Sequence, residues 1–214
     1  MDADKTNMIE DYVDAHTDDV SVLLDELMAE TENITGRAFW SIGKVEGKLL
    51  QLLIKMSKTK RAIEVGTFTG YSALVIAEAL PEDGILITCE NSREYADIAQ
   101  RYFSKSPYGR RIKLKLGPAL PTLNQIAADS QDFVFIDADK PSYGDYFDEA
   151  LRILVPGGLI FVDNVFWRNK IFKKNITNEN ARAIAAFNEK VRQEARVEKV
   201  MLSIRDGVYL MRKR

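Results

Sequence analysis

Two short apolar runs, each followed directly by acidic or amide residues, constrain the fold more than any other feature of this sequence. Residues 133–136 are followed by Asp137, and residues 159–162 by Asp163 and Asn164. A short apolar run without a polar face is typical of a strand buried on both sides of a parallel sheet. Because ligands bind outside the carboxyl ends of such strands, we expect these three polar side chains to meet at one edge of the sheet.

The chemistry of these residues favours a metal site. Two carboxylates and one amide supply hard oxygen ligands, which suit Mg²⁺, Mn²⁺ or Ca²⁺ better than zinc. Lys140 follows Asp137 closely and would lie beside the ion as a base. We therefore predict a divalent-cation site at Asp137, Asp163 and Asn164, with Lys140 as the general base.

The remaining sequence alternates short apolar runs with segments of helical periodicity. Strands that alternate with helices form parallel sheets with right-handed crossovers, and Asp206-Gly207 near the C-terminus is typical of a hairpin turn. We expect an α/β fold with a Rossmann-like, doubly wound, seven-stranded, mostly parallel sheet, its last strand antiparallel, and helices on both faces. The predicted strands are residues 61–65, 85–89, 111–116, 133–136, 159–162, 197–203 and 207–211, and the predicted helices are one or two in 1–33, then 44–56, 71–80, one from 92, 120–128, 143–154 and 180–194.

Composition limits the classes of protein to consider. The chain has 214 residues, 46% hydrophobic and 29% charged, which suits a single domain made of a helical segment at 1–56 and a Rossmann-like core at 57–214. A formal net charge of -2 gives no general electrostatic case for nucleic acid, and the single cysteine, Cys89, excludes an internal disulfide. The acidic N-terminus lacks a signal-peptide pattern, and no apolar run approaches the ~18 residues that span a bilayer. We expect a cytoplasmic protein without membrane contact.

A glycine-rich turn and a downstream acid predict a nucleoside site. Residues 64–70 cover the end of the first predicted strand and the turn after it, and glycines there let the backbone approach a ligand closely. The turn lacks the G-x-G-x-x-G spacing of dinucleotide-binding proteins and the Gly-Lys-Ser/Thr of a phosphate loop. Glu90 ends the second strand, where an acid accepts hydrogen bonds from ribose hydroxyls. Together these features favour S-adenosylmethionine (SAM).

With these motifs in order, the chain resembles the cation-dependent class I SAM O-methyltransferases, which include catechol and caffeoyl-CoA O-methyltransferases and small bacterial relatives. The resemblance extends from about residue 34 to the C-terminal Asp206-Gly207-Val208. The order and spacing of the motifs carry it more than any one of them. The motifs are residues 64–72 (EVGTFTGYS), Glu90, Gly117-Pro118-Ala119, residues 137–140 (DADK), Gly157-Gly158 and Asp163-Asn164.

The resemblance implies a role for each matching residue. Ser72 would lie near the carboxylate of SAM, Glu90 would bind the ribose, and Ala119 would lie at the adenine. Asp137, Asp163 and Asn164 would again hold the metal, with Lys140 as the base. The full cofactor-binding set is Ile42, Glu64, Gly66, Tyr71, Ser72, Glu90, Ala119 and Asp137.

The implied reaction moves the sulfonium methyl of SAM to one of two adjacent hydroxyls on an aromatic ring. A divalent ion orients both hydroxyls and favours the phenolate, and it disfavours the ammonium form of Lys140. Phe39, Trp40, Phe166 and Trp167 are available as aromatic walls, and Phe39, Trp40 and Trp167 are the candidate substrate contacts. The chain departs from the family at Lys48, where glutamine is common, and at residues 165–168 (VFWR). These differences bear on the identity of the substrate more than on the type of reaction.

Other readings stay open. Some bacterial relatives methylate a hydroxylated uridine in tRNA, and the basic loop at Lys170, Lys173 and Lys174 and the tail at 212–214 motivate that substrate here. A non-catalytic SAM-binding protein is a third reading. The resemblance also implies a homodimer. The apolar stripe at residues 20–28 is compatible with a dimer contact and equally with packing on the chain's own core.

Overall fold

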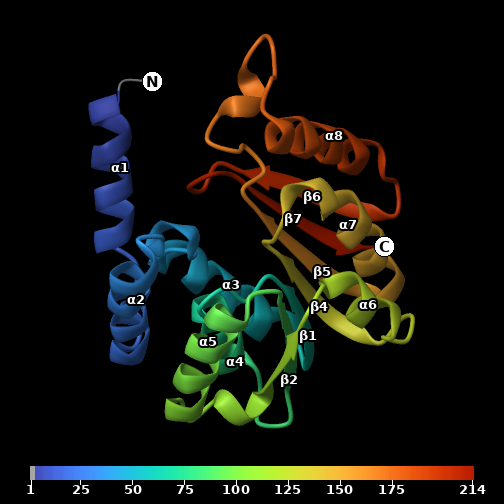
Figure 1. Cartoon of the computed structure of the whole chain (residues 1–214). Helices are drawn as coiled ribbons and strands as arrows, with labels where there is room; N and C mark the ends of the chain where they lie inside the picture. Colours follow the sequence, from blue (N-terminus) through green and yellow to red (C-terminus); the bar gives the residue numbers. More distant parts are fainter. Residues whose placement is uncertain (1–2) are drawn as a thin grey trace.

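Within residues 3–214, which the computed structural model describes (side chains from Met8 onward), seven strands form one mixed sheet (Figure 1). The strands are β1 (Arg61–Val65), β2 (Ile85–Glu90), β3 (Ile112–Leu116), β4 (Gln131–Ile136), β5 (Leu154–Asp163), β6 (Val197–Leu202) and β7 (Val208–Lys213). Their order across the sheet is β3-β2-β1-β4-β5-β7-β6. Strands β1 to β5 are parallel, whereas β7 is antiparallel to both β5 and β6, which confirms the predicted fold.

Helices cover both faces of this sheet. Helices α2 to α5 pack on one face and α6 to α8 on the other, and Figure 1 shows the two groups on opposite sides. The helices are α1 (Ala3–Ala15), α2 (Val22–Thr35), α3 (Lys44–Ser57), α4 (Tyr71–Ala79), α5 (Arg93–Lys105), α6 (Ala119–Asn124), α7 (Tyr143–Ile153) and α8 (Glu179–Gln193), with short 3-10 turns η1 (Ala38–Trp40), η2 (Gly109–Arg111), η3 (Lys140–Ser142) and η4 (Lys170–Phe172).

The molecule has two hydrophobic cores, one on each face of the sheet, because side chains along the central strands alternate between the two faces. Phe133 and Phe135 of β4 join the core beneath α2 to α5, while Val134 and Ile136 join the core beneath α6 to α8. All four side chains are fully buried, because successive residues of a strand point to opposite faces. The apolar run of β4 therefore serves both layers, as expected of a strand covered on both sides.

Strand register sets the position of the site. Val65 of β1 pairs with Ile136 of β4, which in turn pairs with Val162 of β5. The residues that follow these three strands therefore emerge side by side at the carboxyl edge of the sheet. Asp137 N also donates a hydrogen bond to Val65 O at 2.9 Å, which continues the ladder past the strand ends.

Two elements differ from their predicted bounds by four residues or more. Helix α6 ends at Asn124 rather than near residue 128, because the Arg152 guanidinium donates to the carbonyls of Leu123 and Ile126 and ends the helix there. Strand β5 begins at Leu154 rather than at residue 159. Its early part passes through Gly157 at a positive φ of 86°, a feature that an apolar run does not reveal.

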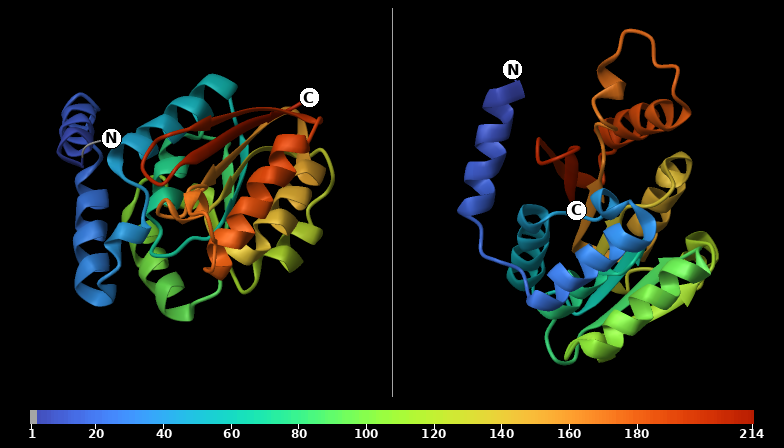
Figure 2. Two further views of the ribbon diagram at one scale, coloured as in Figure 1. Left: turned by 90° about the horizontal axis from the view of Figure 1, so that it is seen from above. Right: turned by 60° about the vertical axis from the view of Figure 1, so that its left-hand side comes forward.

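Helix α1 stands apart from the sheet layers. Figures 1 and 2 show it projecting away from the body of the molecule. Lys44 of α3 holds its end through an ion pair with Asp14 at 3.2 Å. Across residues 3–214, no helix is both long enough and apolar enough to cross a membrane.

Candidate active site

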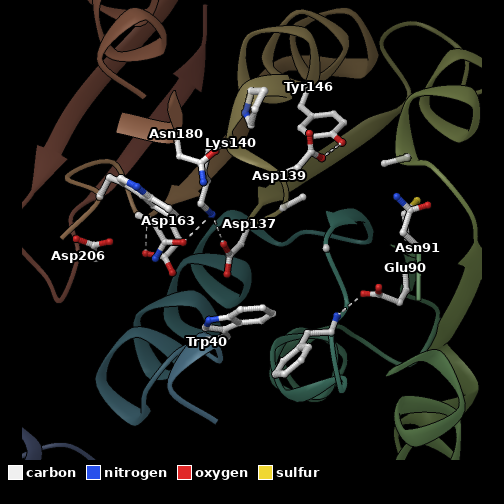
Figure 3. A pocket seen from close by; sticks show the side chains of 18 of the residues that line it. Trp40, Glu90, Asn91, Asp137, Asp139, Lys140, Tyr146, Asp163, Asn180 and Asp206 are labelled. Atoms are coloured by element: carbon white, nitrogen blue, oxygen red, sulfur yellow. Dashed lines mark hydrogen bonds and ion pairs between the residues drawn. The ribbon is translucent and has the colours of Figure 1, made fainter. Parts of the chain in front are cut away.

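A cavity of about 700 Å³ lies at the carboxyl ends of β1, β2, β4 and β5. This is the place at which open α/β sheets bind ligands, and the volume is ordinary for a small-molecule site. Figure 3 shows Lys140, Asp137 and Asp163 directed toward one another, with Trp40 near them and Glu90 with Asn91 at the other end. The predicted site residues that line the cavity are Phe39, Trp40, Gly66, Glu90, Ala119, Asp137, Lys140, Asp163, Asn164 and Trp167.

Four predicted cofactor residues do not line the cavity. They are buried behind it, with 9% exposure or less, where the N-terminal ends of α3 and α4 pack against β1. A backbone contact or a small adjustment would be needed for them to touch a ligand. These residues are Ile42, Glu64, Tyr71 and Ser72.

Lys140 lies at the centre of the acidic end. Its Nζ donates to Asp137 Oδ1 at 2.8 Å, to Asn164 Oδ1 at 2.8 Å and to Tyr143 Oη at 2.6 Å. The side chain is only 6% exposed, and η3 carries it inward from the end of β4. These three hydrogen bonds use all three N–H donors of the ammonium group. To act as a base, Lys140 must first lose one of these protons, and with it one of the three hydrogen bonds.

The donor set fits a divalent cation. Asp137 and Asn164 already aim oxygens at one positive charge, the Lys140 ammonium, and the Asp163 carboxylate is almost fully buried nearby. Burial, and next the negative charge of Asp137, raise the pKa of Asp163 to about 7. The Lys140 ammonium is one positive charge beside two close carboxylates, and a dication would supply the further positive charge that both need to stay ionised.

The third donor of this set is an amide oxygen. Asn164 adopts a positive φ of 61°, and its backbone N–H donates to Asp163 Oδ1 at 2.5 Å. In residues 3–214, no three His, Cys, Asp or Glu side chains gather as a candidate metal site. A site at this edge therefore depends on Asn164 beside the two aspartates.

The glycine turn after β1 brings backbone close to the metal-site strand. Gly66 has a φ of 102°, and a Cβ there would lie 1.9 Å from the carbonyl oxygen of Asp137. Only glycine permits this approach. The turn residue Phe68 donates its backbone N–H to Glu90 Oε2 at 2.7 Å, so Glu90 holds the turn while it faces the cavity.

Glu64 carries a polar atom without a partner. The Thr88 hydroxyl donates to Glu64 Oε2, while the buried Oε1 accepts no hydrogen bond from the described residues. Burial raises the pKa of Glu64 to about 8. An unsatisfied buried acceptor beside the glycine turn fits a ligand with an ammonium group, as SAM has at its methionine end.

Nothing in the sequence indicated another buried acid, Glu46. Glu46 of α3 is fully buried, and its nearest cation is Arg205, whose Nη1 lies 3.5 Å from Oε2. Burial, and next the charge of Asp163, raise the pKa of Glu46 well above its ordinary value. Arg205 also donates to Ser41 O at 2.9 Å and lines the cavity. No local signal would have found this pair, because its members lie far apart in sequence.

Tyr143 is another residue to which the sequence assigned no role. Its hydroxyl receives a hydrogen bond from Lys140 and donates to Asp163 O at 3.1 Å, so it links the base to the metal-site strand. Burial raises the pKa of Tyr143 well above its ordinary value, so it remains a neutral phenol. Its place one helical turn after Lys140 is the signal that could have found it.

Aromatic side chains form much of the outer wall. Trp40 packs on Phe68 with ring centroids 5.5 Å apart, and Phe68 packs on Tyr95 at 4.7 Å. The ring of Trp167 lies 5.5 Å from Lys140 Nζ. Phe166 is different, because it packs against Phe172 and the turn at 205–207 outside the cavity lining, and so does not form a wall.

Comparisons with known proteins agree with this geometry. The O-methyltransferase family model matches residues 14–214. A probable caffeoyl-CoA O-methyltransferase 1 of Dictyostelium discoideum is 34% identical over 212 residues, covering 97% of this chain and 92% of that protein. Tricin synthase 2 of Oryza sativa subsp. japonica is 35% identical over 203 residues, covering 88% and 70%. The Bacillus cereus O-methyltransferase, solved in complex with SAH, is 28% identical with a TM-score of 0.88 and covers 97% of each chain.

Proposed function

Because the chain belongs to the SAM-dependent O-methyltransferases of the caffeoyl-CoA type, we propose that it methylates one hydroxyl of a vicinal aromatic diol, using a divalent cation and Lys140 as base. The observation that carries the proposal is the convergence of Asp137, Asn164 and Lys140 at 2.8 Å contacts inside the cavity. The printed names of the caffeoyl-CoA relatives support an aromatic acceptor.

In this proposal Asp137, Asp163 and Asn164 hold the ion, with Mg²⁺ the expected occupant. The ion supplies Lewis acidity that favours a phenolate over a neutral phenol. The backbone N–H of Asn164 donates to the Asp163 carboxylate and so orients this one ligand before any ion binds.

Lys140 removes the proton from the hydroxyl that becomes methylated. Lys140 lines the cavity, and its Nζ is positioned by Tyr143, whose hydroxyl lies 2.6 Å away. The rings of Tyr143 and Trp167 lie 4.7 Å and 5.5 Å from the same nitrogen and restrict the access of water to it. A dry site favours the meeting of an anionic acceptor with a cationic donor, because both charges are neutralised.

The cofactor occupies the other half of the cavity. SAM supplies a methyl group on a sulfonium centre. Glu90 accepts from the ribose hydroxyls and Ala119 lies at the adenine. A small adjustment of the buried Glu64 brings its free oxygen to the methionine ammonium. Gly66 lets the turn approach the cofactor, and Ser72 lies near its carboxylate.

A panel of matched acceptors tests the proposed reaction. Methyl transfer from labelled SAM would be measured with catechol, with phenol and with 2-methoxyphenol, in the presence of Mg²⁺. Transfer to catechol, with phenol and 2-methoxyphenol at least roughly a hundredfold slower, is expected, because only two adjacent hydroxyls bind one ion together. Equal rates for catechol and phenol would contradict the vicinal-diol assignment.

A hydroxylated uridine in tRNA is the second candidate acceptor. The row formed by Trp40, Phe68 and Tyr95 is a surface on which a base could stack, and the Arg37 guanidinium lies 4.6 Å from the centroid of Trp40. Mass spectrometry of tRNA nucleosides from a strain lacking the gene tests this candidate. Unchanged nucleosides would remove it.

We also propose that two copies of the chain associate through α1. This helix projects from the body and exposes Met8, Ile9, Tyr12 and Val13 at 40% or more. Exposed apolar side chains grouped on one helix favour contact with another protein surface, and the family resemblance makes a second copy the expected partner.

A further inference from the structure

One arginine of the cavity has no role in the proposed reaction. Arg168 lines the cavity together with Lys140, Asn164 and Trp167. Its guanidinium lies over the ring of Phe39, 5.3 Å from the centroid. Within residues 8–214, no carboxylate lies within ion-pair distance of its side chain.

The other arginine of the cavity is already committed. Arg205 forms its ion pair with the buried Glu46 at 3.5 Å and donates to Ser41 O at 2.9 Å. The nearby Asp206 is engaged as well, because its Oδ1 accepts the backbone N–H of Arg168 at 2.5 Å. Arg168 is therefore the cation at this end of the cavity that remains available to a ligand.

The loop that carries Arg168 is held in an unusual conformation. Trp167, Arg168 and Asn169 have consecutive positive φ values of 47°, 52° and 59°. Such conformations are costly for residues other than glycine and persist only where the surroundings impose them, which is typical of binding sites. Here the Trp167 indole donates to Asn178 Oδ1 at 2.9 Å, and Asp206 receives backbone N–H groups of the loop.

Charge is distributed unevenly along the cavity. Glu90 and Asp139 line the cofactor half, where a sulfonium cation is expected. Arg168 and Arg205 also line the cavity, together with Asp206, whose carboxylate accepts the backbone N–H of Arg168. A ligand that spans from the metal site toward Arg168 would meet an acidic site for its diol and then a cation.

We propose that the natural acceptor is a catechol that carries a carboxylate on a short side chain, and that Arg168 binds this carboxylate. The inference rests on the proposed function and names the substrate class. A guanidinium pairs with a carboxylate through two parallel N–H···O bonds, and the Phe39 ring supports the opposite face of the guanidinium. Arg168 is thus a specificity-determining residue.

Three catechols of similar size test the proposal: 3-(3,4-dihydroxyphenyl)propanoate, its primary amide and 2-(3,4-dihydroxyphenyl)ethylamine. Initial rates would be measured with SAM and Mg²⁺. The carboxylate is expected to exceed the amide in kcat/KM by roughly tenfold or more, the value of a charge-assisted hydrogen bond, and the amine is expected to be the poorest.

Arg168→Gln is expected to lower the carboxylate-to-amide ratio of kcat/KM by roughly tenfold, mainly through KM. Arg168→Lys should lower it by less, because lysine keeps the positive charge and loses only the planar fork. Lys173→Gln is the matched control, since Lys173 is an exposed cation of the following segment that does not line the cavity.

A wild-type enzyme that methylates carboxylate and amide equally, or a preference that survives in Arg168→Gln, would overturn the proposal. Methylation of none of the three catechols would instead overturn the proposed function, a result recognisably different from equal methylation of all three.

Discussion

The Nζ atom of Lys140 donates hydrogen bonds to Asp137, Asn164 and Tyr143, so its position is fixed before any ligand binds. If it removes the acceptor proton, Lys140→Met should lower kcat by roughly a hundredfold to ten-thousandfold, the range for loss of a general base. SAM affinity measured by calorimetry should change little. Lys113→Met, on the exposed edge of β3, is the control, and a loss below tenfold in Lys140→Met would contradict the role.

The buried carboxyl of Glu64 makes the free energy of unfolding depend on pH. Burial raises its pKa to about 8 in the folded protein, against an ordinary value of 4.5. The folded state therefore binds more protons than the unfolded chain across this window, and its stability falls as pH rises from 4.5 to 8. Urea unfolding of Glu64→Gln without ligand should show a stability advantage over wild type that is absent near pH 4.5 and grows by roughly 4 kcal/mol by pH 8 and above. An advantage that does not change with pH would contradict the assignment.

For single residues, the sequence was sufficient to predict which side chains lie close together when their position depends only on where a strand ends. Asp137, Asp163, Asn164 and Lys140 follow two buried strands, and they do meet in one cavity. The Glu46 contact with Arg205 could not be predicted, because it joins α3 to the turn before β7 and depends on packing between distant segments.

The turn between β1 and α4 depends on Gly66. A Cβ there would meet the Asp137 carbonyl at 1.9 Å, and the φ of 102° is unfavourable for any other residue. Gly66→Ala should therefore destabilise the protein by at least about 3 kcal/mol in urea unfolding. Gly36→Ala is the matched control, because Gly36 also has a positive φ but nothing lies within 4 Å of its added Cβ, so about 1 kcal/mol is expected. Equal losses would contradict the close approach.

The elements differ in how well they could be predicted. Strand β1 has its predicted bounds, since its apolar run ends at a glycine turn. The C-terminal end of α6 could not be predicted. It depends on Arg152 of α7, whose guanidinium donates hydrogen bonds to the carbonyls of Leu123 and Ile126. The left-handed conformation of residues 167–169 could not be predicted either, because contacts with Asp206 and Asn178 impose it.

For the whole molecule, the projecting α1 predicts self-association. Met8 and Tyr12 are 71% and 66% exposed on a helix with few contacts to its own chain. Sedimentation velocity should show a dimer for wild type and a monomer for a Met8→Glu, Tyr12→Glu variant. Met56→Glu is the control, because Met56 is equally exposed but lies on α3. A wild-type monomer, or a dimer that survives the double substitution, would contradict this arrangement.

The proposed reaction requires a divalent cation, so the dependence of turnover on Mg²⁺ is its most direct test. After chelation and removal of the chelator, turnover of catechol and SAM would be followed as Mg²⁺ is added to wild type and to Asp163→Asn. We expect no turnover without the ion and a saturable rise for wild type. For the variant, which has lost one charged ligand, the rise should be displaced to roughly tenfold or higher Mg²⁺ concentration. SAM binding should persist without the ion. Undiminished turnover in excess EDTA would contradict the account.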